Sequence, residues 1–307
     1  PDPDRTRMRK ADLYQRTGRL TEAREILEEM MALDPLNLDP MNQLIKLEIR
    51  NGNFDRAETL AEEMREVALT ATDTTNAWNF LLQVYSATGR IAKTEAELVE
   101  YEQYLRRTTP LNVIVMQNYL AKAYYALITG REERIEQLTK EVAAYDESRA
   151  NMYKCYLPYY SGVYQLPYFE NASLLPECIK QLSGMGQTFA SYAEVASYFL
   201  GEDHVATADY LAAKRAEGLE PATKFAEARA NRLAGRLDKA LVIVEEGLLE
   251  SPGSPELLLE FAYLQRDRGE ADAALGTLKK AQNIWSKADD NFIPAQRAKK
   301  LADELAG

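Results

Sequence analysis

Side chains that commonly carry out catalysis are scarce in this sequence. His204 is the only histidine among 307 residues, so a histidine-rich metal site cannot be built. The chain has no phosphate-binding P-loop, no Gly-x-Gly-x-x-Gly, no His-Glu-x-x-His and no Gly-x-Ser-x-Gly motif. Adjacent acidic pairs such as Glu28-Glu29 do not face each other on a helix, so they do not form an acid and base pair. We therefore predict a protein that is not an enzyme and that holds no metal or cofactor.

The two cysteines, Cys155 and Cys178, leave two interpretations open. Their spacing is not that of a metal site. A single disulfide between them fits the sequence. Two separate buried thiols fit equally, because free cysteine behaves as a small buried hydrophobic residue.

Tyrosine is the binding-type side chain with the most uneven distribution. Twelve of the 18 tyrosines lie between Tyr101 and Tyr168. Tyrosine combines a rigid ring with a hydroxyl and is enriched in binding surfaces. Spacings of three and four residues fit the buried stripe of a helix as well, so core and partner-binding surface both remain open. The surface candidates are Tyr156, Tyr159, Tyr160 and Tyr164.

The charge and apolar content restrict the class of partner. The chain has 48 acidic and 37 basic side chains and a formal net charge of −11. Such a chain repels phosphate backbones, so we expect no nucleic acid partner. Apolar residues make up 46% of the sequence, which supports a substantial core and argues against disorder. No apolar run reaches the roughly 18 residues of a membrane span.

The start of the chain says little about its compartment. It begins at Pro1 rather than at a methionine and shows no secretory leader pattern. We therefore expect a piece of a longer soluble protein, and both the cytoplasm and the bacterial periplasm fit.

Glycines that recur at a fixed period mark the ends of the helices that position these side chains. Gly18 and Gly52 are 34 residues apart, as are Gly201, Gly235 and Gly269, and each heads a Gly-x4-Ala pattern. A glycine that ends a helix can adopt the left-handed conformation that caps the last carbonyls. The alanine five residues later lets two helix backbones approach closely. The sequence therefore predicts repeated helix–turn–helix units.

Other residues fit the same units. Thr21, Asp55 and Asp238 are placed as N-caps of second helices. Pro35 and Pro252 each follow their glycine by 17 residues, where a proline ends the second helix. Apolar residues between these points recur with a helical period.

These features resemble the tetratricopeptide repeat family, whose 34-residue unit follows a Trp-x2-Leu-Gly-x2-Tyr…Ala-x3-Phe…Pro pattern. The matching residues are Trp78, Leu81, Tyr85 and Gly89 in one unit, Ala11, Tyr14, Gly18, Ala23, Leu27 and Pro35 in another, and Ala262, Gly269, Ala274, Leu278 and Ala281 in a third. The resemblance implies an all-α, right-handed superhelix of about eight helix–turn–helix repeats with a C-terminal closing helix. We expect one continuous array, divided into repeats over 1–144, an irregular tyrosine-rich repeat over 145–184, repeats over 185–286 and the closing helix over 287–307.

In that family the first helix of each pair lines a concave groove, which implies a set of partner-binding residues here. The set is richer in arginine and tyrosine than the acidic chain as a whole, which suits an extended or acidic segment. Its members are Arg16, Asn42, Lys46, Asn79, Gln83, Tyr124, Tyr198, Arg229, Arg232, Tyr263 and Arg266. We expect Arg229, Arg232 and Arg266 to be exposed.

The leading functional hypothesis is a non-enzymatic scaffold or adaptor that holds a protein or peptide in this groove. The alternative is an assembly or regulatory module of a bacterial envelope, secretion or exopolysaccharide-export protein. In that case the ligand is a polysaccharide, and the tyrosine-rich zone stacks against its sugars.

Overall fold

The computed structural model describes residues 3–164, 166, 177–178, 180, 187–201, 203–218 and 223–306, with the backbone alone over 187–193. Within these ranges the protein is helical and contains no strand, which confirms the predicted all-α fold. Part of the predicted irregular repeat, including Tyr168, lies outside the described residues. The helices are α1 (Pro3–Arg16), α2 (Leu20–Leu33), α3 (Asp39–Asn51), α4 (Phe54–Val67), α5 (Ala71–Ala87), α6 (Ile91–Leu105), α7 (Leu111–Ile128), α8 (Glu132–Ala143), α9 (Glu147–Lys154), α10 (Leu157–Tyr164), α12 (Gln187–Leu200), α13 (His204–Ala216), α14 (Lys224–Leu233), α15 (Leu237–Glu250), α16 (Pro255–Asp267), α17 (Ala271–Ile284), the 3₁₀ turn η2 (Trp285–Lys287) and α18 (Ile293–Ala306).

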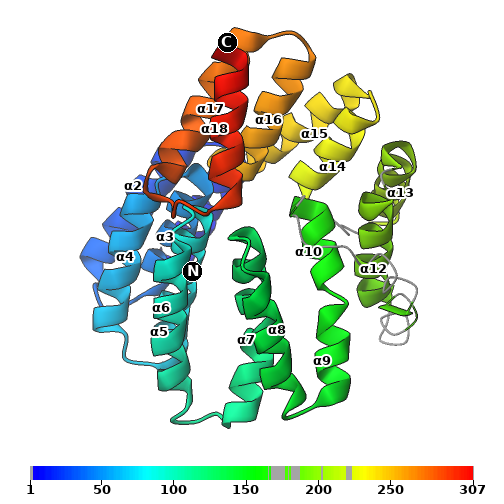
Figure 1. The fold of residues 1–307 in the computed structure, drawn as a ribbon. Helices are drawn as coiled ribbons and strands as arrows, with labels where there is room; N and C mark the ends of the chain where they lie inside the picture. Colours follow the sequence, from blue (N-terminus) through cyan, green and yellow to red (C-terminus); the bar gives the residue numbers. More distant parts are fainter. Residues whose placement is uncertain are drawn as a thin grey trace.

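The 16 described α-helices that precede α18 pack pairwise, from α1 with α2 to α16 with α17 (Figure 1). Turn glycines behave as predicted at Gly18, Gly52, Gly235 and Gly269, whose φ angles lie between 75° and 80°. Gly201 is the exception among the five, because its φ is not in the left-handed region. The glycine period therefore locates most of the turns within pairs.

The predicted N-caps were wrong by two positions. The second helices begin earlier, so the caps are Arg19, Asn53 and Arg236, and none of these side chains forms a capping hydrogen bond. Asp55 and Asp238 lie inside the first helical turn instead. There their negative charge still interacts favourably with the helix dipole.

Consecutive pairs are joined along their second helices by arginine–carboxylate contacts. Arg90 contacts Glu58 of the preceding pair at 2.7 Å, and Arg131 contacts Glu95 at 2.9 Å with both guanidinium nitrogens. Further contacts of this kind join Arg56 to Glu28, Arg236 to Asp209 and Arg268 to Asp238. Beneath them the alanines of the Gly-x4-Ala pattern are buried at positions 23, 57, 240 and 274. Small residues inside and charge pairs outside thus hold successive pairs in register.

The array also folds back on itself. Closing helix α18 packs on α16 and α17, in agreement with the predicted helix. The turn before α18 lies against the N-terminal half of the chain, as Figure 1 shows for the red and the blue to cyan helices. The Nε1–H of Trp285 donates to the carbonyl oxygen of Ala87 at 3.1 Å. A second contact lies nearby, where the N–H of Gly253 donates to the carbonyl of Arg50 at 3.0 Å.

The two cysteines form a disulfide. Cys155, just after α9, is bonded to Cys178 with the two Cα atoms 5.1 Å apart. The bond lies in a small buried cluster with Tyr156. Of the two interpretations left open by the sequence, the structure shows the paired one.

Candidate functional site

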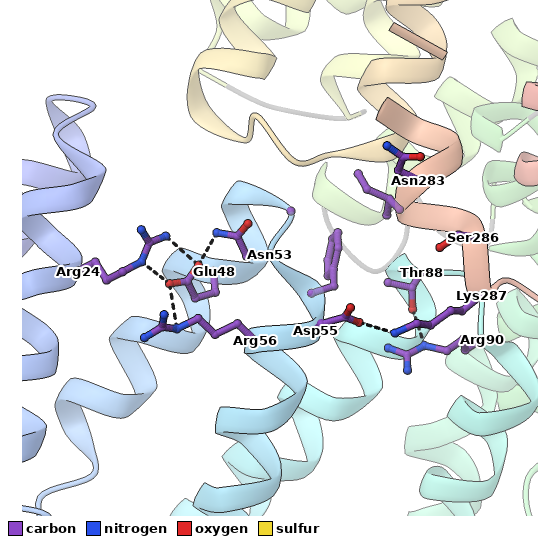
Figure 2. A pocket seen from close by; sticks show the side chains of 13 residues that line it. Arg24, Glu48, Asn53, Asp55, Arg56, Thr88, Arg90, Asn283, Ser286 and Lys287 are labelled. Atoms are coloured by element: carbon purple, nitrogen blue, oxygen red, sulfur yellow. Dashed lines mark hydrogen bonds and ion pairs between the residues drawn. The ribbon is translucent and has the colours of Figure 1, made fainter. Parts of the chain in front are cut away.

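A pocket of about 570 Å³ lies where the two halves of the chain meet (Figure 2). One wall comes from α2, α3, α4 and the turn before α6. The other comes from the end of α17 and from η2. The lining residues are Arg24, Glu48, Gly52, Asn53, Phe54, Asp55, Arg56, Thr88, Arg90, Asn283, Ile284, Ser286 and Lys287. We call this hollow the junction pocket.

On the N-terminal wall, Glu48 is a fully buried carboxylate. Arg24 contacts it with two nitrogens, at 2.6 and 3.0 Å, and Asn53 donates to it at 2.6 Å. Burial disfavours the ionised form of Glu48, but the hydrogen bonds from Arg24 and Asn53 outweigh burial and lower its pKa. Glu48 is therefore a charged anchor that fixes the position of Arg24.

Arg90 is held in a similar way. Its Nη1 donates to Glu58 at 2.7 Å, and its Nε donates to the hydroxyl of Thr88 at 2.9 Å. The guanidinium carbon lies 4.7 Å from the ring centre of Tyr85. Its Nη2 is buried and has no hydrogen-bond partner. Arg90 thus keeps one donor unused beside the pocket.

The other two cations are much more exposed. Lys287, from η2, donates to Asp55 at 2.7 Å, with side-chain exposures of 58% and 79%. Arg56 pairs with Glu28 and, at 3.6 Å, with buried Glu48, and 48% of the Arg56 side chain is exposed (Figure 2). Exposed pairs of this kind contribute about 0–1 kcal/mol. A carboxylate from a ligand can therefore replace Asp55 or Glu28 at small cost.

The pocket lining holds four cations and two carboxylates, on a chain whose net charge is −11. This arrangement can bind carboxylates through charge-assisted hydrogen bonds. Sequence reasoning missed these residues. The arginine directly after the turn glycine at Gly89-Arg90 is a visible signal for one residue of the N-terminal wall, but Arg24 and Arg56 carry no such signal. No local pattern indicates that Lys287 lies opposite them.

The predicted groove residues do not form one surface. Lys46, Asn79 and Gln83 are exposed on α3 and α5, and Arg16 on α1 is exposed and pairs with Asp12. Asn42 is half-buried and donates to the carbonyl of Leu38. The first three pairs therefore keep polar candidates at the surface.

Two of the predicted arginines were assigned wrongly as exposed groups. Arg229 and Arg232 are only 4% and 7% exposed. Arg229 donates to the carbonyl of Gly162 at 2.8 Å, and burial lowers its pKa to about 10. Arg232 contacts buried Glu260 at 2.5 Å and Asp267 at 2.9 Å. Both guanidinium groups are thus directed at the protein itself rather than at solvent, although the Nε of Arg229 has no hydrogen-bond partner. Arg266 is the partly exposed member of the three.

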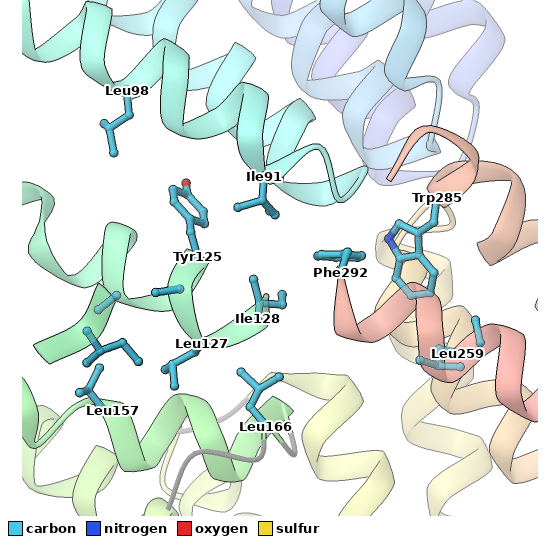
Figure 3. Packing of buried hydrophobic residues seen from close by; sticks show 14 of the residues in the cluster. Ile91, Leu98, Tyr125, Leu127, Ile128, Leu157, Leu166, Leu259, Trp285 and Phe292 are labelled. Atoms are coloured by element: carbon cyan, nitrogen blue, oxygen red, sulfur yellow. The ribbon is translucent and has the colours of Figure 1, made fainter. Parts of the chain in front are cut away.

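The fold-back fills the space beside these arginines with apolar side chains (Figure 3). One buried cluster joins Tyr125 and Ile128 of α7 to Leu259 of α16 and to Trp285 and Phe292. Tyr124 and Tyr263 pack against the same cluster. The middle of the predicted groove is consequently core.

The tyrosines of the secondary surface are also engaged within the protein. Tyr156 is buried, and Tyr160 and Tyr164 lie 5.4 and 5.1 Å from the ring of Tyr124. Burial raises the pKa of Tyr164, and it raises the pKa of Tyr125 to about 12. The remaining members of the two sets are half-buried: Tyr159 packs beside Tyr160, and Tyr198 lies 4.6 Å from Tyr210. These contacts favour the core interpretation of the tyrosine stripe.

The described residues offer neither a metal-type cluster nor a membrane-spanning helix. They contain no group of three or more His, Cys, Asp or Glu side chains that could hold a metal ion. No helix in the described part of the chain combines the length and apolar character needed to cross a membrane.

Comparison with known proteins gives a family and several distant structural similarities. Residues 14–72 match the family model of the tetratricopeptide repeat. No curated protein matches the sequence. A tetratricopeptide repeat protein from Parabacteroides merdae is 14% identical, with all of both chains covered and a TM-score of 0.41. Yeast Tom70 is 12% identical over 96% of this chain and 72% of its own, with a TM-score of 0.43. Human IFIT1, solved as a dimer with m7Gppp-AAAA, is 14% identical over 87% of this chain and 66% of its own, with a TM-score of 0.47.

Identities this low carry no function from these proteins to the chain. The family model, in contrast, covers α2, α3 and α4 and the turn at Gly52. Glycine-turned pairs of the same kind recur at Gly89, Gly130, Gly235 and Gly269. The chain therefore contains a tetratricopeptide repeat segment at residues 14–72, within a longer array of helical pairs.

Proposed function

We propose that this protein is a non-enzymatic adaptor that holds an acidic segment of a protein partner at the junction pocket. Tetratricopeptide repeat proteins are generally protein–protein interaction modules and typically non-catalytic. The observation that carries the finer proposal is the convergence of Arg24, Arg56, Arg90 and Lys287 on one pocket of an acidic chain. An extended peptide rich in aspartate and glutamate matches that charge.

The four cations divide into two roles. Arg24 and Arg90 are positioned by Glu48 and Glu58, so they present a fixed positive wall. Lys287 pairs with exposed Asp55 and Arg56 with exposed Glu28, and both can exchange these partners for carboxylates of the ligand, while Arg56 keeps its 3.6 Å contact with buried Glu48.

The test is binding of a fluorescent peptide of alternating Glu and Ser residues, measured by anisotropy. Lys287→Ala and Arg56→Ala should each weaken binding several-fold, and affinity should fall with added salt because exposed charge pairs are screened. Lys300→Ala is the matched control, since that side chain is 80% exposed on α18 and does not line the pocket. Equal affinities of Lys287→Ala, Lys300→Ala and the unaltered protein would reject the pocket as the site.

A second candidate function is an assembly or regulatory module of a bacterial envelope, secretion or exopolysaccharide-export system. The Cys155–Cys178 disulfide favours it, because disulfides persist in oxidising compartments such as the periplasm. A separate hollow of about 650 Å³ on α5 and α6 offers Trp78 and Tyr104, with rings 5.0 Å apart, for stacking against sugars. Retention on immobilised acidic polysaccharide that Trp78→Ala abolishes would support this function. Equal retention of both proteins would contradict it.

A further inference from the structure

The junction pocket has a property that its lining alone does not reveal: neither half of the chain forms it alone. Arg24, Arg56 and Arg90 come from the first three helical pairs, whereas Lys287 comes from the turn before α18. The two walls face each other only because residues 285–292 lie on the turns of the N-terminal half. We call this stretch the clasp.

The clasp is held by specific contacts at the turn between α5 and α6. The N–H of Asp289 donates to the carbonyl of Gly89 at 2.9 Å, and the Asp289 carboxylate accepts from the N–H of Ala92 at 2.7 Å. Trp285 and Phe292 are 4% and 1% exposed on the same turn. The hydrogen bonds of Asp289 join turns, whereas Trp285 and Phe292 also pack in the buried cluster that contains residues of α7 and α16.

Gly89 is the point at which the clasp comes closest. Its φ is 74°, and a Cβ placed there would lie 2.6 Å from the ring of Phe292 and 2.7 Å from the Cβ of Ala288. Gly235 has nearly the same φ, 75°, but nothing lies within 4 Å of its hypothetical Cβ. A glycine is therefore required at 89 by the clasp as well as by the backbone.

We propose that docking of the clasp and binding of an acidic ligand at the junction pocket are coupled, so that the ligand holds the array closed. The inference rests on the function proposed above. A ligand that contacts Lys287 together with Arg56 or Arg90 finds its complete site only in the closed array. By linkage, any change that opens the clasp must weaken binding of the ligand. Binding of the ligand must in turn favour the docked clasp by the same factor.

The experiment compares Gly89→Ala with Gly235→Ala in the full chain. Both substitutions carry the cost of a positive φ, and only Gly89→Ala collides with the clasp. Small-angle X-ray scattering reports the radius of gyration, and anisotropy reports affinity for the Glu/Ser peptide. We expect Gly89→Ala to expand the protein and to weaken binding about tenfold, with saturating peptide reversing part of the expansion. Gly235→Ala should change neither quantity.

A milder variant keeps the test decisive if Gly89→Ala does not fold by circular dichroism. Trp285→Phe retains a buried ring but removes the hydrogen bond to Ala87, so it should produce smaller shifts in the same directions. An expanded Gly89→Ala or Trp285→Phe protein with unchanged affinity overturns the coupling and leaves the proposed function standing. Unchanged dimensions in both variants also overturn it. Failure of the unaltered protein to bind the peptide rejects the proposed function itself, and the coupling with it.

Discussion

The indole Nε1–H of Trp285 donates to the carbonyl oxygen of Ala87, a residue 198 positions earlier in the chain. Ala87 is the last residue of α5, whose final carbonyls have no partner within the helix. A tryptophan from the opposite end of the protein thus caps an N-terminal helix. This contact closes the array, and α6 of the third pair shares a buried cluster with α16, α17 and α18.

Arg232 and Arg266 make a matched pair, because each guanidinium lies 5.1 Å from the ring centre of Tyr263. Arg232→Ala should cost about 3–5 kcal/mol of unfolding free energy, since it leaves the buried Glu260 carboxylate without its partner. Arg266→Ala should cost at most about 1 kcal/mol, because its pairs are partly exposed. Urea midpoints of the two variants measure the difference. Equal midpoints would mean that Arg232 is not buried as described.

Because of Glu48, the free energy of unfolding should depend on pH in the acid range. Its folded pKa is lowered, so its contribution is complete above the unfolded-state pKa of about 4.3 and is lost as pH falls through the folded value. Glu48→Gln should cost about 1–3 kcal/mol at pH 7. The difference from the unaltered protein should shrink below about pH 4. Urea melts at several pH values test this, with exposed Glu245→Gln as the control. A difference that is constant with pH would contradict the charged anchor.

The disulfide should contribute measurably to stability. It closes a loop with a sequence separation of 23 residues between Cys155 and Cys178. Chain-entropy arguments assign a loop of this size about 3 kcal/mol. The double change Cys155→Ala and Cys178→Ala should lower the thermal midpoint by several degrees, and reductant should lower that of the unaltered protein alone. Detection of two free thiols in the oxidised, unfolded chain by mass spectrometry would exclude the bond.

Ala240 tests the close packing of α14 and α15. It is 1% exposed and lies in a cluster with Ala228, Val244 and Leu264. Ala240→Leu should destabilise the protein by about 1–3 kcal/mol through overpacking. Val242→Leu, at a side chain that is 53% exposed on the same helix, should be nearly neutral. Identical urea midpoints for the two variants would contradict the position of Ala240 on the buried face of α15.

The sequence alone determined the helical pairs of this protein. Glycines at a 34-residue period, the alanines that follow them and the apolar helical period act over one or two turns of helix, so their consequences are local. The same reasoning located α18, since its apolar face shows in the sequence. It did not locate the N-caps, because Arg19, Asn53 and Arg236 end the turns without side-chain hydrogen bonds.

Only the tertiary structure decided which predicted binding residues reach the surface. Arg232 and Arg266 are 34 residues apart and occupy equivalent places in α14 and α16, yet Arg232 is buried against Glu260 whereas 34% of the Arg266 side chain is exposed. The path of a repeat array depends on a small rotation at each interface, and such rotations accumulate over many pairs. The turn-glycine spacing departs from 34 residues between Gly52 and Gly130, but the sequence does not state the angle that results. Closure by Trp285 and Phe292, and with it the junction pocket, follows from that accumulated geometry.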